Sequence, residues 1–205
     1  MKYSFKAWFY GHFFHSTCKK ELKKAGVSGS DLRKIVMEHK RITFRAKDMN
    51  DEKLLSSYIM GIYFIALNRV TNLSPEKNYE ILRGALANSS IFRKGLGTAK
   101  EYLDQKKIPE RLKWSKESYE REGENNWVVD VLPGCEEYDL GYDYHECGIC
   151  KICRDEGCPE LAKYLCELDY LIADVMGATL VRTKTLAEGG DFCDFRYSLK
   201  KRGES

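Results

Sequence analysis

Hydrophobic residues in the first 120 positions recur at the spacing of α-helices. Tyr79, Leu82 and Leu86 fall three and four residues apart, which places them on one face of a helix. Residues 54–70 are apolar almost throughout, as is typical of a helix that is covered on several sides. The pattern therefore predicts a helical region with a buried helix at its centre.

Residues that favour helix ends mark several boundaries in this region. Ser74 and Pro75 predict a helix start, because serine accepts hydrogen bonds from free N–H groups and proline suits the first turn. After the break at residues 26–29, we expect Ser30 or Asp31 to cap the second helix. Two further helical segments are expected, at 98–105 and 110–120.

After the polar segment 120–126, the pattern changes to the alternation that is typical of strands. Residues 126–134 and 138–147 each predict one strand, and the first ends in a Pro-Gly turn. Residues 178–199 predict a hairpin whose two arms are joined by a turn at 188–191. The second part of the chain is therefore expected to form an antiparallel sheet.

One helix is expected between these strands, over residues 158–177, with Pro159 near its start and Gly177 at its end. The order of elements predicts an α+β fold, in which an N-terminal helical region precedes about four antiparallel strands packed against one long helix. We expect a helical region over 1–120 and an α+β domain over 127–200 that carries a cysteine-rich loop. The two parts could also form one compact domain.

Composition and charge narrow the classes of function. Residues 1–120 contain 24 Lys and Arg against 13 Asp and Glu, whereas residues 121–205 contain 10 against 18. Lysine-rich helix faces would explain this asymmetry, as would two parts that attract each other. The net charge of +3 does not favour nucleic acid. No secretory signal or apolar run of about 18–20 residues is visible. We expect a cytoplasmic protein that acts on a small molecule without a membrane partner, as a monomer or a homo-oligomer.

Five of the eight cysteines lie in HECGICKICRDEGCPELAKYLCELD, residues 145–169. Four of them are spaced C-x2-C-x2-C-x4-C: Cys147, Cys150, Cys153 and Cys158. This spacing is one residue longer than a bacterial ferredoxin run, and no second run follows. A zinc site could add His145 or Cys193 as a ligand. Zinc or another divalent metal, an iron–sulfur cluster and metal-free thiols therefore remain open, with buried thiols favoured for Cys147 and Cys150.

The end of this stretch brings a thiol and a carboxylate together. Cys166 and Asp169 are three residues apart on the predicted helix, so they share a face. That face borders the apolar stripe of the helix, where an unpaired carboxylate would be costly. Asp169 is therefore expected to have either a bonding partner or a chemical role.

Alternation along the predicted hairpin assigns its side chains to two faces. Cys193 shares a face with the aromatic residues of the second arm. Arg182 shares a face with leucines of the first arm, which makes it a candidate buried partner for Asp169. Thr183 and Thr185 are expected on the opposite face.

Together these motifs resemble the L-2-amino-thiazoline-4-carboxylic acid hydrolase family. The matching pieces are Cys166 and Asp169 on a helix, the segment RTKTLAEGG (182–190) and the closing CDFRY (193–197). The resemblance is strongest over residues 153–197. It implies a hydrolase that opens a cyclic amidine, a thiazoline carrying a carboxylate, toward a carbamoyl-cysteine by cleaving a C–N or C–S bond.

The resemblance and the chemistry of the side chains suggest roles. Cys166 would be the nucleophile, Asp169 the acid/base or the amidinium anchor, and Cys193 a third catalytic group. Alternatively, Cys166 and Cys193 would ligate a metal that activates water. Arg182 would hold the substrate carboxylate. Further substrate-binding candidates are Thr185, His145, which could act as a base, and Asp194.

A non-catalytic module is the alternative function. Such a protein would bind a small molecule or a metal, as zinc or an iron–sulfur centre, without turnover. The cysteines from 147 to 158 would then be the ligands, and purified protein would contain about one metal ion or cluster per chain.

Overall fold

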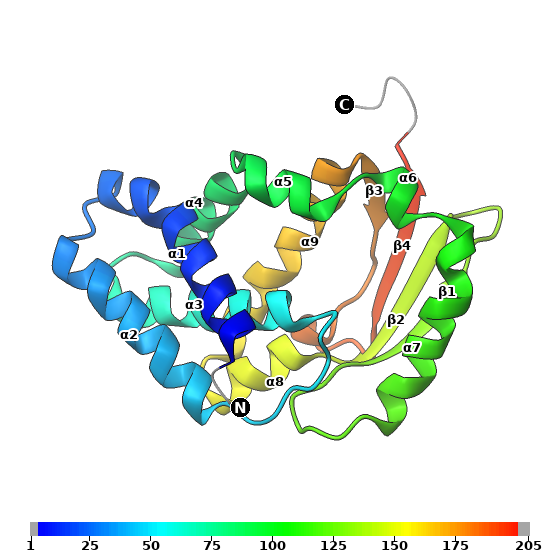
Figure 1. The fold of residues 1–205 in the computed structure, drawn as a ribbon, viewed down its shortest axis with the longest axis horizontal. Helices are drawn as coiled ribbons and strands as arrows, with labels where there is room; N and C mark the ends of the chain where they lie inside the picture. The colour runs from blue at the N-terminus through cyan, green and yellow to red at the C-terminus, as the bar shows by residue number, and fades with distance from the viewer. Residues whose placement is uncertain (1–3, 201–205) are drawn as a thin grey trace.

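Helix α3 (Leu55–Val70) lies at the centre of the helical half of the molecule. In the computed structural model, which describes residues 4–200, it packs against α1 (Phe5–Lys24), α2 (Gly29–Arg45) and α4 (Pro75–Ala87) (Figure 1). Eleven of its sixteen residues are buried. The predicted central helix is therefore confirmed.

The helix starts agree with the sequence in one case and differ in another. Ser74 caps α4 as predicted, because its side chain accepts a hydrogen bond from the Lys77 N–H. The cap of α2 is Ser28, and the prediction of Ser30 or Asp31 is wrong. The Ser28 backbone is extended, and its Oγ accepts a 3.1 Å hydrogen bond from the Asp31 N–H, so the helix begins at Gly29.

Short helices connect the bundle to the sheet. The segment expected at 98–105 contains α6 (Ala99–Tyr102) and a 3-10 turn (Gln105–Lys107), and the segment expected at 110–120 is α7 (Ile108–Glu120). Helix α5 (Ser90–Leu96) was not predicted, because its polar start and nearby glycines are typical of a loop. Figure 1 shows α5 and α6 running from the bundle to the sheet.

The sheet has four antiparallel strands in the order β1-β2-β4-β3. They are β1 (Val128–Pro133), β2 (Leu140–Glu146), β3 (Ala178–Val181) and β4 (Cys193–Leu199). The cross-strand pairs place apolar side chains of all four strands on one face, which forms a core with α7 and α9. The predicted α+β class is thus confirmed.

Helix α9 (Ala162–Met176) lies between the bundle and the sheet (Figure 1). It follows a 3-10 turn (Pro159–Leu161) and ends at Gly177, whose φ of 84° is favourable for glycine. Leu165 and Leu168 pack in the core of the bundle, whereas Ala173 and Met176 pack in the core of the sheet. Polar residues on α9 therefore lie where the two cores meet.

Two predicted segments differ from the structure. The expected cysteine-rich loop contains a helix, α8 (Gly148–Asp155), which packs against α3, because apolar positions three and four residues apart gave it a buried face. The first hairpin arm ends at Val181, because Asp194 accepts hydrogen bonds from the Thr183 and Lys184 N–H groups and turns the chain away from the sheet. Within residues 4–200, no helix has the length and hydrophobicity needed to cross a membrane.

Candidate functional site

Three elements bring thiols within electrostatic range of one carboxylate. Cys166 and Asp169 lie on α9, Cys193 begins β4, and Cys147 lies between β2 and α8. Burial is the largest cause of the raised pKa of Cys166, and the charges of Cys147, Asp169 and Cys193 raise it further, so these four groups lie within electrostatic range of one another. The structure thus brings together the three predicted catalytic residues, and it adds Cys147.

Asp169 forms an ion pair with Arg182, the partner considered from the sequence. The Arg182 Nη1 lies 2.8 Å from the Asp169 Oδ2, and its Nη2 donates a 3.2 Å hydrogen bond to the Cys166 carbonyl oxygen. The guanidinium carbon also lies 5.0 Å from the ring centroids of both Tyr170 and Phe195. Arg182 is therefore bound on several sides, which fixes the position of the carboxylate.

The two partners differ in their access to solvent. The Arg182 side chain is 3% exposed, whereas that of Asp169 is 31% exposed although protein surrounds it on most sides. Burial raises the pKa of Asp169 to about 7, and the charge of Arg182 opposes this rise only in part. A carboxyl group that titrates near neutrality and remains in contact with solvent can exchange protons with a bound molecule.

Cys166 and Cys193 are held as neutral thiols. Burial is the main cause of the raised pKa of Cys166, and the charges of Cys147 and Asp169 add to it. Burial also raises the pKa of Cys193 to about 11, while the Leu186 N–H donates a 3.2 Å hydrogen bond to its Sγ. The charge of Arg182 opposes both rises without cancelling them, so neither thiol is a strong nucleophile in the free protein.

Cys147 differs from these thiols because it occupies the N-cap position of α8. The thiol of Cys150 is the largest cause of its lowered pKa, with further contributions from the N–H groups of Cys150 and Ile149, whereas burial opposes them. Both Cys147 and Cys150 are partly exposed, not buried as expected. A C-x2-C pair at a helix start was the sequence signal for this site.

Gly148 allows the first turn of α8 to approach the chain before β1. A Cβ atom at this position would lie 2.4 Å from both the Asn125 carbonyl oxygen and the Trp127 ring. The absence of a side chain at Gly148 therefore permits the start of α8, with Cys147 at its N-cap, to pack against the segment before β1.

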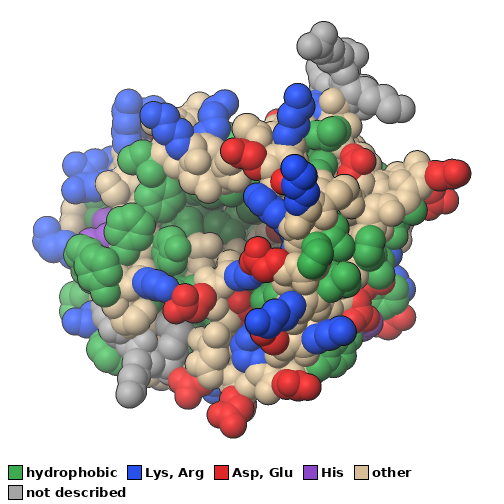
Figure 2. Space-filling model, turned by 45° about the vertical axis from the view of Figure 1, so that its right-hand side comes forward, with side chains coloured by type: hydrophobic (Ala, Val, Ile, Leu, Met, Phe, Trp, Pro, Cys, Tyr) green, Lys and Arg blue, Asp and Glu red, His purple; other side chains and the backbone are tan. Residues whose placement is uncertain are grey.

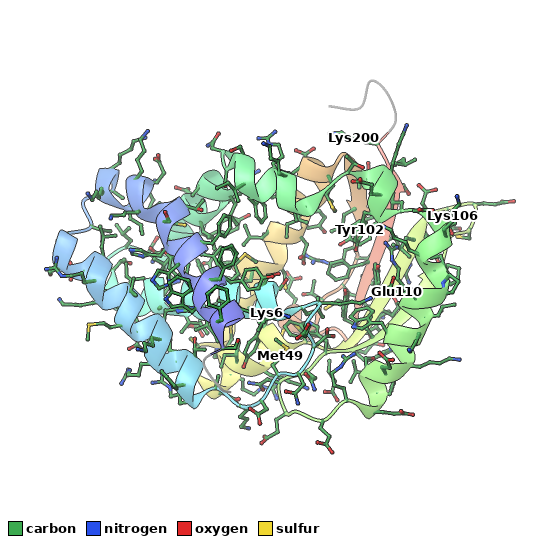
Figure 3. The ribbon with its side chains drawn as sticks, in the orientation of Figure 1. Lys6, Met49, Tyr102, Lys106, Glu110 and Lys200 are labelled. Carbon is green, nitrogen blue, oxygen red and sulfur yellow. The ribbon has the colours of Figure 1, made fainter. Side chains whose placement is uncertain are left out.

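Aromatic side chains form the wall of the site on the side of the sheet. Tyr144 and Phe195 are in edge-to-face contact at 5.1 Å, and Tyr102 meets Tyr197 at 5.3 Å between ring centroids. Figure 3 shows Tyr102 reaching from α6 into the space between the bundle and the sheet. Burial is the main cause of the raised pKa values of Tyr144 and Tyr197, and the charge of Asp169 adds to both.

Two of the other predicted substrate-binding residues, His145 and Asp194, lie on the outer face of the sheet. His145 is on the outer face of the sheet, where its Nε2 lies 2.9 Å from the Asp130 Oδ2. Asp194 is on the same outer face and holds the loop after β3. Thr185 is buried and caps the 3-10 turn Leu186–Glu188. The structure therefore places His145 and Asp194 on the face of the sheet opposite to Cys193, whereas Thr185 precedes Leu186, whose N–H donates to Cys193.

The second pair of clustered cysteines lies at the far end of α8. Cys153 is buried, and its thiol is paired with that of Cys158, which lowers the pKa of Cys158 and raises that of Cys153. Within the part of the chain that the structure describes, no group of three or more His, Cys, Asp or Glu side chains is arranged to hold a metal ion.

Comparison with known proteins identifies a family. A family model described as L-2-amino-thiazoline-4-carboxylic acid hydrolase matches residues 52–197, which include α3 to α9, strands β1 to β3 and most of β4. No curated protein and no solved structure matches the chain significantly. The match covers most of the chain. It includes Cys147, Cys166, Asp169 and Cys193, which together are called the thiol–carboxylate site below.

Proposed function

Since the chain belongs to the L-2-amino-thiazoline-4-carboxylic acid hydrolase family, we propose that it is a hydrolase that opens a cyclic amidine by thiol chemistry. The observation that carries this proposal is that Cys166 and Asp169 lie one turn apart on α9, with Asp169 held by Arg182 and the thiols of Cys147 and Cys193 within electrostatic range. A carboxylate beside thiols suits a cationic, electrophilic carbon such as that of an amidinium.

In this proposal Asp169 binds the substrate cation. A protonated cyclic amidine carries its positive charge on N–H groups, which can donate hydrogen bonds to a carboxylate. Arg182 is a positioning residue, because it lies beneath the carboxylate and leaves the other side of Asp169 open. The pKa of about 7 also allows Asp169 to take up a proton from water during hydrolysis and return it afterwards.

Cys166 is the proposed nucleophile because it precedes Asp169 by one helical turn on the same face of α9. Its raised pKa keeps the thiol neutral in the free protein. A cationic amidine bound at Asp169 would favour the thiolate, since a nearby positive charge lowers the pKa of a thiol. Binding of the correct substrate would therefore activate the nucleophile.

The reaction then requires two displacements at one carbon. Cys166 gives its proton to Asp169 and adds as a thiolate to the amidine carbon; the ring C–S bond then breaks, and the leaving ring sulfur takes that proton from Asp169. Water next adds to the same carbon, gives a proton to Asp169, and the Cys166 thiolate leaves. One water molecule is consumed, and the products are a free thiol and a urea group.

Hydrolysis in ¹⁸O-labelled water tests the proposal. With 2-aminothiazoline-4-carboxylate as the probe, mass spectrometry should find one ¹⁸O atom in the urea product. Cys166→Ser and Asp169→Asn should each lower kcat/KM by about 100-fold or more. The matched control is Cys135→Ser, because Cys135 is exposed in the β1–β2 turn. Full turnover by both folded site variants would contradict the proposed mechanism.

A further inference from the structure

An apolar cavity opens between α1, α3, α5 and α9. Its volume is about 310 Å³, and five of its twelve lining residues are aromatic. Those that matter most here are Phe9, Phe13, Met60, Phe92, Leu96 and Ile172. Figure 2 shows a hollow with hydrophobic side chains on this side of the molecule. The volume lies at the lower end of the range for small-molecule sites.

This cavity adjoins the thiol–carboxylate site along α9. Ile172 lies one helical turn after Asp169, so their side chains are neighbours on the helix surface. Ile172 also packs against the core of the sheet together with Tyr102 and Tyr144. The charge of Asp169 in turn acts on Tyr144. A molecule bound at Asp169 can therefore extend past Ile172 into the cavity.

The lining of the cavity determines which chemical group fits there. Apart from Ser56, Ser57 and the Tyr10 hydroxyl, the lining residues described by the structure present apolar side chains or no side chain, and none of them is charged. Arg182, the cation of the site, is 3% exposed and is paired with Asp169. A substrate carboxylate in this cavity would lose its hydration without gaining a cationic partner, which is costly.

We propose that the substrate is a cyclic amidine with a bulky apolar substituent, an aryl or branched alkyl group, which occupies this cavity while the amidine lies at Asp169. This inference rests on the proposed function and names the substrate class of that site. A cavity of roughly 150 Å³ lined by apolar side chains accommodates benzene. The space between α1 and α9 therefore accepts a substituent of one to two rings.

Calorimetry on the whole chain tests this substrate class. The probes are 2-aminothiazoline-4-carboxylate and 2-amino-4-phenylthiazoline, which differ only in the group that would enter the cavity. The phenyl compound should bind about tenfold to a hundredfold more tightly, the gain expected from burying one aromatic ring. Equal affinity, stronger binding of the carboxylate or no binding of either compound would overturn the inference.

Two matched variants test whether the preference for the phenyl compound arises in this cavity. Phe9→Asp places a charge at the rim of the cavity, whereas Phe44→Asp places one on α2; the two side chains are 51% and 56% exposed. The phenyl preference should vanish in the first variant and persist in the second. Loss in both variants or in neither would overturn the inference. So would a change of oligomeric state with Phe9→Asp alone, because the cavity would then be part of an interface between copies.

Turnover of the same two compounds separates this inference from the proposed function. If the chain hydrolyses both with the same kcat/KM, the hydrolase proposal stands and the apolar substrate class fails. If it binds the phenyl compound selectively but hydrolyses neither, the cavity is confirmed as a binding site and the hydrolase proposal fails.

Discussion

Replacing Arg182 with glutamine should change the pH at which the protein is active. Arg182 lies 2.8 Å from Asp169 and is the main group that opposes the rise of its pKa. In the proposed mechanism the substrate cation binds ionised Asp169. For the wild-type protein, kcat/KM should therefore increase as the pH rises through about 7.

The size of the shift follows from the geometry. Two unit charges about 4 Å apart interact by about 4 kcal/mol at an effective dielectric constant of 20. This energy corresponds to about three pKa units, since each unit is worth about 1.36 kcal/mol. Asp169 is 31% exposed, and glutamine keeps one hydrogen-bond donor, so about one to two units is the expected rise. The pKa of Asp169 should then lie above about 8.

The assay is the pH dependence of kcat/KM, supported by ¹³C NMR titration of the Asp169 carboxyl group. At pH 7, Arg182→Gln should reduce kcat/KM by about fivefold to fiftyfold, and the loss should diminish as the pH approaches about 9.5. Recovery at high pH distinguishes a shifted titration from a damaged fold. Arg196→Gln is the matched control, because Arg196 pairs with Asp143 at 2.7 Å on the outer face of the sheet. A profile that keeps its wild-type midpoint would refute the reasoning.

Three further predictions concern stability and thiol reactivity. The folded-state pKa of Asp169 exceeds its unfolded value, so this group stabilises the fold below about pH 4 and loses that contribution as the pH rises through about 7. Relative to Asp169→Asn, the wild type should lose at most about 4 kcal/mol of unfolding free energy across that window; a constant difference would contradict the raised pKa. Gly148→Ala should destabilise the protein by about 1–3 kcal/mol or more in urea unfolding, because its Cβ would lie 2.4 Å from backbone and ring atoms. Gly84→Ala, whose Cβ meets nothing within 4 Å, should stabilise it by about 0.5–1 kcal/mol, and equal effects would count against this steric argument. Iodoacetamide should modify Cys147 faster than Cys166 in peptide mapping, because the pKa of Cys147 is lowered and that of Cys166 is raised. Faster modification of Cys166 would be inconsistent with these pKa shifts.

Much of the fold was predictable because local patterns and packing agree. The apolar run at 54–70 is buried in the bundle. The alternation of apolar and polar residues along the strands agrees with which side chains pack in the core of the sheet. The helix spacing that joins Cys166 to Asp169 also predicted a shared site, and the position of Arg182 suggested its pairing with Asp169. These inferences depended on neighbours within one element or on adjacent elements.

Other features depended on contacts that local patterns do not encode. The spacing of the cysteines suggested a loop, whereas the apolar positions between them fold as α8 against α3. The lowered pKa of Cys147 requires both the helix start and the neighbouring thiol. The apolar cavity joins Phe9, Phe92 and Ile172, which come from three separate helices, so only the tertiary structure could show it.

Trapping of the covalent intermediate tests the central claim most directly. The protein would be mixed with excess 2-aminothiazoline-4-carboxylate, quenched in acid within the first turnovers and digested for peptide mass spectrometry. The account predicts an amidine adduct on Cys166 that carries the mass of the opened substrate and is absent from Cys166→Ser. Turnover without an adduct, or with the adduct on Cys147, would contradict it.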